Sequence, residues 1–175
     1  NARKHYRFNI NGAENRMKND KLKFLILNGP NINFLGIREP EIYGHETYND
    51  LIELIKDHAK RRGVSVEFYQ SNHEGDLVDA IQKAYFDRLD GIVFNPAAYT
   101  HTSVAIADAV KGTGIPTVEV HISDISRREA FRQISYVGAV AKKTVKGEGF
   151  GGYLTALDYL IGLAERKGNE DAGNN

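Results

Sequence analysis

The chain contains no cysteine, which excludes a disulfide framework and any catalysis by a thiol. It also has no excess of charge of either sign, because Lys plus Arg and Asp plus Glu number 23 each. Electrostatics therefore give no reason to expect nucleic acid or an anionic membrane as the main partner. No apolar run approaches the roughly 18 residues of a membrane-spanning helix. These absences predict a soluble, cytoplasmic globular protein.

The two ends of the chain lack the apolar patterns of a folded core. Residues 1–16 are polar, contain no apolar signal-peptide core and precede the first methionine, Met17, so we interpret them as a leader or a disordered extension. Residues 168–175 are rich in Gly, Asn and acidic side chains, and we expect them to be disordered as well. The stretch between them, residues 17–167, has the length and composition of a single domain.

Apolar strands and helical patterns alternate along this domain. Short apolar runs predict strands over residues 23–28, 64–68, 91–94, 117–121 and 141–145. Apolar residues at helical spacing predict helices over residues 47–63, 75–87, 102–111, 127–134 and 150–166. Thr47 and Asp50 form a near capping box at the start of the first helix. The alternation predicts an α/β fold, a flavodoxin-like doubly wound sheet of five parallel strands in the order 2-1-3-4-5, with helices on both faces.

Polar residues follow three of the predicted strands at the point where each strand ends. They occupy residues 28–31 after the first strand, 95–101 after the third and 119–123 at the end of the fourth. In the predicted order the first and third strands are neighbours, and the loops that follow them leave toward opposite faces of the sheet. Open parallel sheets bind ligands in the crevice at such a point. We therefore expect the three groups to meet in one binding crevice.

The stretch between Asn28 and Thr47 is long for a loop in a compact domain, and such loops are usually lids or binding segments. It carries Arg38 and Tyr43. A guanidinium close to a phenol favours the tyrosinate, so Tyr43 is a candidate general base. In the alternative interpretation, the ring of Tyr43 packs on the domain and Arg38 is a solvated charge.

Glu119 and His121 are two residues apart on a predicted strand, so they point to the same face of the sheet. A carboxylate beside an imidazole holds its tautomer and favours its charged form, which makes His121 a candidate proton donor. A buried structural pair is the alternative. Ile122 and Ser123 follow where the strand ends, and their backbone amides and the Ser123 hydroxyl can hold a carboxylate.

The remaining candidates offer hydrogen bonds and positive charge. Asn95 and His101 flank the predicted crevice, where an amide and an imidazole can bind the hydroxyl groups of a ligand. Arg128 and Arg132 lie at helical i, i+4 spacing and form either a solvated stripe or a second anion clamp. Helix capping alone is an alternative role for the hydroxyl residues of this region, which are Thr100, Thr102 and Ser103.

Six motifs follow one another along the chain. They are Leu27-Asn28-Gly29-Pro30-Asn31, Arg38-Glu39-Pro40 with Tyr43-Gly44, Gln70-Ser71-Asn72-His73-Glu74-Gly75, Asn95 to Ser103, Glu119-Val120-His121-Ile122-Ser123, and Arg128 with Phe131-Arg132. In this order and with this spacing, they resemble the motifs of type II 3-dehydroquinate dehydratases. The resemblance runs from about Lys23 to Leu163, nearly everything outside the two ends of the chain. One departure is Ala97, where glycine is common in the family, because alanine tolerates a positive φ less well.

The resemblance implies a lyase that eliminates water from 3-dehydroquinate in the anti sense, through an enolate, to give 3-dehydroshikimate in the shikimate pathway of aromatic amino acid biosynthesis. It implies Tyr43 as the base, Arg38 as the residue that activates it, and His121 as the acid that protonates the leaving hydroxyl. It implies no cofactor and no metal, and a homododecamer built from trimers in which Asp108 reaches a neighbouring subunit's site. The other residues that it implies are Asn31 and Glu119, which organise the site, and Asn95, His101, Ile122, Ser123 and Arg132, which bind substrate.

The residues also bear on other possible functions. A phosphoacceptor receiver domain shares the predicted sheet order but needs acidic residues where this chain has Asn28 and Asn95. A flavin carrier needs a hydroxyl-rich phosphate loop after the first strand, which this chain lacks. A Schiff-base enzyme needs a lysine, and none lies in the crevice motifs. A non-catalytic protein that binds small anions on the same scaffold is a further alternative. A metal hydrolase is the last, with His73, His101, Glu119 and His121 as possible ligands.

Overall fold

The computed structural model describes residues 21–37, 46–125 and 129–173, and the predicted leader lies outside these ranges. Five strands form one parallel sheet in the order β2-β1-β3-β4-β5. The order predicted from the sequence is therefore confirmed. The strands are β1 (Lys23–Asn28), β2 (Ser65–Gln70), β3 (Gly91–Asn95), β4 (Thr117–His121) and β5 (Lys143–Lys146).

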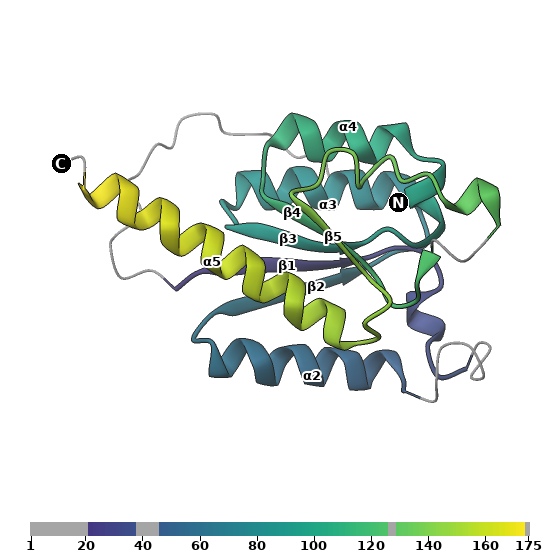
Figure 1. The fold of residues 1–175 in the computed structure, drawn as a ribbon, viewed down its shortest axis with the longest axis horizontal. Coiled ribbons are helices and arrows are strands. Elements are labelled where there is room, and N and C mark those ends of the chain that lie inside the picture. Colours follow the sequence, from purple (N-terminus) through teal and green to yellow (C-terminus); the bar gives the residue numbers. More distant parts are fainter. Residues whose placement is uncertain (1–20, 38–45, 126–128, 174–175) are drawn as a thin grey trace, which may run out of the picture.

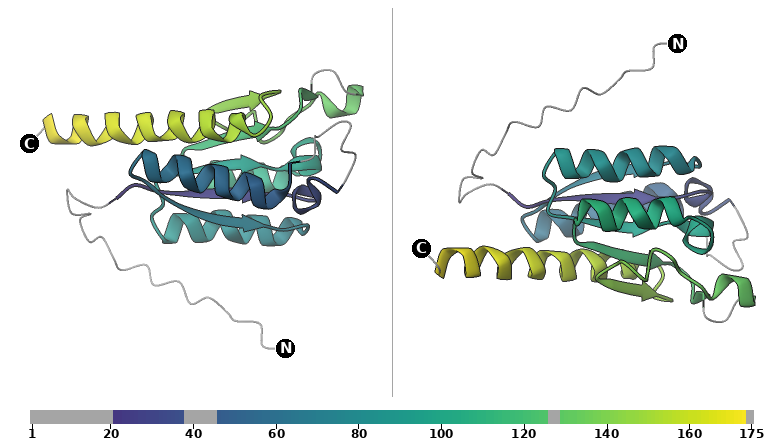
Figure 2. Two further views of the ribbon diagram at one scale, coloured as in Figure 1. Left: turned by 90° about the horizontal axis from the view of Figure 1, so that it is seen from below. Right: turned by 90° about the horizontal axis from the view of Figure 1, so that it is seen from above.

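Within the described residues, four α-helices cover the two faces of the sheet (Figures 1 and 2). Helices α2 (Tyr48–Arg61) and α5 (Gly151–Gly173) pack on one face, and α3 (Glu74–Phe86) and α4 (Val104–Thr113) pack on the other. None of these helices has the length and apolar character needed to cross a membrane. Short 3₁₀ helices follow three of the strands and are η1 (Ile32–Phe34), η2 (Ala97–His101) and η4 (Ala130–Arg132).

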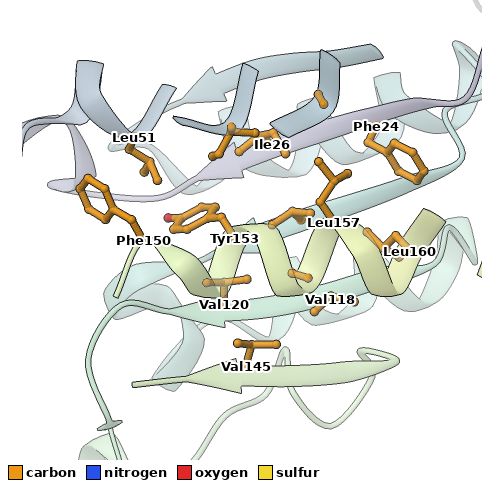
Figure 3. Packing of buried hydrophobic residues seen from close by; sticks show 14 of the residues in the cluster. Phe24, Ile26, Leu51, Val118, Val120, Val145, Phe150, Tyr153, Leu157 and Leu160 are labelled. Carbon is orange, nitrogen blue, oxygen red and sulfur yellow. The ribbon is translucent and has the colours of Figure 1, made fainter. Parts of the chain in front are cut away.

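The side chains of the central strands alternate between two apolar clusters, as the two-residue period of a strand requires. Phe24 and Ile26 of β1 join the cluster beneath α2 and α5, whereas Leu25 and Leu27 join the cluster beneath α3 and α4. Figure 3 shows the first cluster, where side chains of α5 pack on β1 and β4. Because both faces of β1 and β3 are covered, these strands have nearly continuous apolar sequences. Strand β4 is also buried throughout, but it carries Glu119 and His121 among its apolar residues.

The first helix begins where its capping residues predict. Thr47 Oγ1 accepts a hydrogen bond from the backbone N–H of Asp50 at 3.2 Å, and Asp50 Oδ2 accepts one from the backbone N–H of Thr47 at 2.8 Å. In α4, Ser103 Oγ accepts from the backbone N–H of Ile106 at 2.9 Å, so the helix begins at Val104 rather than at residue 102. Both starts follow from side-chain oxygens that bind free backbone N–H groups.

The α-helix predicted over residues 127–134 is absent from the described part of that range. Residues 129–134 contain only the three-residue η4. Phe131 and Ile134 are 64% and 59% exposed, so the segment buries no apolar face that would stabilise an α-helix. The apolar residues whose spacing predicted a helix therefore do not pack on the core here.

The terminal helix is longer than its apolar pattern predicts. Helix α5 continues to Gly173 instead of ending at Arg166, and it enters the range 168–175, for which the composition predicted disorder. The residues that carry it past the apolar stretch include Glu165 and Lys167, which have high helix propensity.

Candidate functional site

A pocket of about 110 Å³ opens at the carboxyl ends of β1, β3 and β4. Two larger depressions, of about 370 and 570 Å³, lie along α3 and do not combine polar residues from these strand ends. The crevice predicted from the strand order is therefore present. The predicted site residues that line it are Asn31, Asn95, His101, His121, Ile122, Ser123 and Arg132.

The turn after β1 approaches the turn after β3 so closely that a side chain would not fit. The backbone N–H of Gly29 donates to the carbonyl oxygen of Asn95 at 2.8 Å, and a Cβ on Gly29 would lie 2.4 Å from the carbonyl oxygen of Pro96. Asn31 then adopts the left-handed conformation, with φ 67°, which asparagine tolerates better than most residues. The close approach of the two turns brings Asn31 and Asn95 to one pocket.

Asn72 and Gln70 support this turn, although the sequence analysis gave them no individual role. Asn72 Oδ1 accepts from the backbone N–H of Asn31 at 3.0 Å and from Gln70 Nε2 at 3.1 Å. Gln70 Nε2 also lies 3.2 Å from the carbonyl oxygen of Gly29, to which it donates. The signal in the sequence was their place in the motif that follows the second predicted strand.

Asn95 is buried at the end of β3, and both ends of its amide are engaged. Its Oδ1 accepts from the backbone N–H of Ala97 at 3.1 Å, and its Nδ2 donates to Tyr153 Oη at 2.9 Å. Ala97 has φ 52°, so the positive φ that made alanine notable at this position is present. The turn after β3 therefore combines a strained residue with an oriented amide.

His101 presents one defined nitrogen to the pocket. Its Nδ1 lies 2.7 Å from the carbonyl oxygen of Ile134. A carbonyl oxygen only accepts hydrogen bonds, so Nδ1 carries the proton and Nε2 is the acceptor of the neutral ring. An acceptor in this position suits a ligand hydroxyl.

Glu119 and His121 form a buried pair on β4, as the two-residue spacing predicts. Glu119 is 0% exposed and His121 is 5% exposed, and His121 Nε2 lies 3.1 Å from Glu119 Oε1. The two atoms are close but poorly aligned, so Nε2 has no hydrogen-bond partner among the described residues and the contact is mainly electrostatic. Burial, the largest influence, raises the pKa of Glu119, but the imidazole and two hydroxyls together lower this pKa below its ordinary value. The carboxylate is therefore ionised, and it places a negative charge beside the His121 ring.

Three hydroxyl groups hold the carboxylate of Glu119. Ser135 Oγ donates to Oε1 at 2.7 Å, Thr144 Oγ1 donates to Oε2 at 3.0 Å, and Thr100 also donates to Oε1. Gly138 lies against them, because a Cβ there would be 2.7 Å from Glu119 Oε2. Thr100 thus does more than cap a helix. Ser135, Gly138 and Thr144 were not predicted from the sequence, because no shared spacing points them to the pocket.

A cation lines the pocket beside the end of β4. Arg132 belongs to η4, and its Nε lies 3.1 Å from Glu129 Oε2. Its guanidinium carbon is 5.2 Å from the centre of the Phe131 ring. Ile122 and Ser123 line the same pocket. This part of the pocket can therefore attract an anionic or hydroxylated ligand.

Four other predicted residues are not placed at this pocket. Arg38 and Tyr43, the predicted activating residue and base, lie in residues 38–45, outside the described part of the chain. Arg128 also lies outside the described residues. Asp108 is exposed on α4 and lines the depression between α3 and α4 instead.

The alternative metal site is not formed by the residues that the structure describes. Among them, no group of three His, Asp or Glu side chains gathers closely enough to hold a metal ion. His73, one of the four possible ligands, is exposed at the start of α3. The described residues therefore do not support the metal hydrolase interpretation.

Comparisons with known proteins find close relatives of the whole domain. A family model described as dehydroquinase class II matches residues 22–161. The 3-dehydroquinate dehydratase 1 of Corynebacterium efficiens is 52% identical over 138 residues, which are 79% of this chain and 91% of the relative. The 3-dehydroquinate dehydratase of Clostridium acetobutylicum is 52% identical over 145 residues, which are 83% of this chain and 100% of the relative.

A solved structure agrees with these sequence matches. The crystal structure of a type II dehydroquinase from Butyrivibrio crossotus superposes with a TM-score of 0.79 at 50% sequence identity. The match covers 81% of this chain and 98% of that chain. The stretch of the family match contains every residue that lines the pocket.

Proposed function

The chain belongs to the class II dehydroquinase family, and on this basis we propose that it is a hydro-lyase that removes water from 3-dehydroquinate to give 3-dehydroshikimate. The elimination is anti and passes through an enolate, and the reaction belongs to the shikimate pathway of aromatic amino acid biosynthesis. The observation that carries the mechanism is the buried Glu119–His121 pair, of which His121 lines the pocket. This pair supplies a proton donor beside groups that can hold a small polyhydroxylated acid.

His121 is the proposed acid. Its ring lines the pocket, and its Nε2 lies 3.1 Å from Oε1 of the ionised Glu119, which holds a negative charge beside the ring. When the bond between carbon and the leaving oxygen breaks, the imidazolium donates its proton to that oxygen and water departs. The electron pair of the enolate forms the new carbon–carbon double bond, so the charges balance without an external oxidant or reductant.

Tyr43 is the proposed base, and Arg38 is the residue that activates it. The support for these roles is the motif that contains both residues and the family match that spans residues 22–161. A tyrosinate accepts the proton from the carbon next to the ketone, which creates the enolate. The positive charge of a nearby guanidinium stabilises the tyrosinate before this step.

The remaining pocket residues are proposed to bind and orient the substrate. Arg132 and the strand end at Ile122 and Ser123 suit the substrate carboxylate and hydroxyl groups, and Asn95 and His101 offer hydrogen bonds to its hydroxyls. Asn31 and Glu119 organise the site. We further propose a homododecamer of trimers in which Asp108 contributes to the site of a neighbouring subunit, which agrees with its place outside the pocket of its own chain.

The test is to add 3-dehydroquinate to the purified protein in the presence of a chelator and follow the ultraviolet absorbance of the conjugated ketone product. The wild type should produce it, and turnover should survive borohydride treatment because no imine forms. Tyr43→Phe should keep its fold and substrate binding but lose most turnover. Tyr85→Phe removes a hydroxyl from an exposed position on α3 and is the matched control.

The outcomes separate the candidate functions. Near-normal turnover by Tyr43→Phe would exclude Tyr43 as the base. Loss of wild-type turnover after borohydride would indicate an imine route instead. No product from folded wild-type protein that still binds 3-dehydroquinate would favour the second candidate, a non-catalytic protein that binds small anions.

A further inference from the structure

Tyr153 is a buried polar residue without a part in the proposed mechanism. It lies on α5, it is 0% exposed, and its ring packs in the apolar cluster beneath that helix beside Leu157 and Phe150 (Figure 3). Its hydroxyl oxygen nevertheless contacts the carboxyl ends of two strands, because it bonds to Asn28 of β1 and Asn95 of β3. The helix thus places one phenol behind the pocket.

The direction of each hydrogen bond in this group follows from one backbone N–H. The N–H of Ala97 can only donate, so the atom of the Asn95 amide that faces it at 3.1 Å is Oδ1. The Asn95 Nδ2 therefore faces Tyr153 Oη and donates to it at 2.9 Å. The phenol then gives its own proton to Asn28 Oδ1 at 2.7 Å. Burial outweighs the opposing effect of Asn95 and raises the pKa of Tyr153, so this proton is retained.

The arrangement leaves Asn95 with limited freedom. Its Oδ1 and Nδ2 are each bound on the protein side, and its remaining N–H and lone pair are left for the pocket that it lines. Without the phenol oxygen, the buried Nδ2 loses the partner that it has among the described residues, and the Ala97 N–H alone opposes rotation of the amide. Rotation would exchange a donor for an acceptor at the pocket.

We propose that Tyr153 is a positioning residue that fixes the orientation of the Asn95 amide for substrate binding. The inference rests on the proposed function, since it takes Asn95 as a group that binds 3-dehydroquinate. An interaction made equally in the ground state and the transition state changes KM rather than kcat. Tyr153 should therefore act on KM.

The test compares Tyr153→Phe with Tyr159→Phe, in which the same hydroxyl is removed from the same helix at a residue that packs against Lys143. Because Tyr153→Phe removes one hydrogen bond to Asn95, we expect it to raise KM about tenfold and to change kcat less than about twofold. Tyr159→Phe should match the wild type. A purely structural role would lower the amount of folded enzyme without changing KM.

A double-mutant cycle identifies the residue through which Tyr153 acts. In an Asn95→Ala background the amide is absent, so Tyr153→Phe should change kcat/KM by less than about twofold. If Tyr153→Phe folds poorly, the variant Asn28→Leu with Tyr153→Phe removes the acceptor that would be left unsatisfied at Asn28, and its folding should recover in part. Recovery is only partial because Asn28 also hydrogen-bonds Tyr48, which loses that partner. That double variant should keep the raised KM.

The possible results are distinct. If the wild type is active and Tyr153→Phe has an unchanged KM, the inference about Tyr153 is wrong and the proposed function stands. An equal effect of Tyr153→Phe with and without Asn95 would also overturn it, because the phenol would then act elsewhere. Absence of turnover by the folded wild type would overturn the proposed function and, with it, this inference.

Discussion

Replacing Ala97 with glycine should stabilise the protein, although it removes a methyl group. Ala97 has φ 52° in the turn after β3, where its backbone N–H binds Asn95 Oδ1 at 3.1 Å. An L-residue with a Cβ in the left-handed region costs about 1–2 kcal/mol relative to its ordinary conformations. Glycine adopts this region without that cost. The substitution therefore tests whether the turn is strained.

Two smaller effects oppose the gain. The greater freedom of glycine in the unfolded chain costs about 0.4–1 kcal/mol. The methyl of Ala97 is partly buried against the apolar cluster beneath α5. Losing it costs about a few tenths of a kcal/mol, which is less than the free energy of burying a whole methylene group. The balance is an increase of about 0.5 kcal/mol in the free energy of unfolding.

Ala98→Gly is the matched control. Ala98 is the exposed neighbour of Ala97 in η2, and it is not in the left-handed region, so glycine there should lower the free energy of unfolding by about 0.5–1 kcal/mol. Urea denaturation of both variants at one protein concentration should separate them by about 1 kcal/mol or more. Equal losses in the two variants would refute the argument from strain.

Two further predictions concern Glu119. The fold lowers the pKa of Glu119 below its ordinary value of 4.5. The ionised carboxylate therefore adds to the free energy of unfolding above pH 4.5, and this contribution is lost as the pH falls through the lowered pKa. Urea denaturation at a series of pH values should therefore show that, below about pH 4.5, the free energy of unfolding falls less steeply with pH in Glu119→Gln than in the wild type. Equal slopes for the two proteins would contradict this. Gly138→Ala would place a Cβ 2.7 Å from Glu119 Oε2 and should cost about 1–3 kcal/mol of stability and lower kcat, measured by urea denaturation and steady-state assay. Gly168→Ala, where a Cβ would meet nothing within 4 Å, should have no such effect, and equal results for both would show that the Gly138 contact is relieved without consequence.

The convergence of the pocket residues was predictable because it depends on periodic features. Strand order follows from the alternation of apolar runs and helical patterns, and parallel strands end at the same edge of the sheet. Asn31, Asn95 and His121 could therefore be assigned to one crevice before any contact was known. The pairing of Glu119 with His121 followed in the same way, from a two-residue period on one strand.

The groups that support these residues were not predictable, because they depend on tertiary contacts without a period. Ser135 reaches Glu119 from the stretch after β4, whose described part contains the short η4 instead of the expected helix. Thr144 reaches Glu119 from β5, and this contact depends on the register of β4 and β5. Tyr153 occupies an apolar position of α5, so its sequence context predicts a core residue. Its hydroxyl contact with Asn95 depends on how α5 crosses the sheet, which no local pattern specifies.

The position and the orientation of the site groups therefore have different physical origins. The backbone contact between Gly29 and Pro96 sets how closely the turns after β1 and β3 approach, and so where Asn95 lies. The direction of its amide is set separately, by Ala97 N–H on one side and Tyr153 on the other. Substitutions at Gly29 should consequently disturb the fold of the pocket, whereas removal of the Tyr153 hydroxyl should leave the pocket in place and alter only what Asn95 presents to a ligand. Affinity can therefore change at this site without a change in its shape.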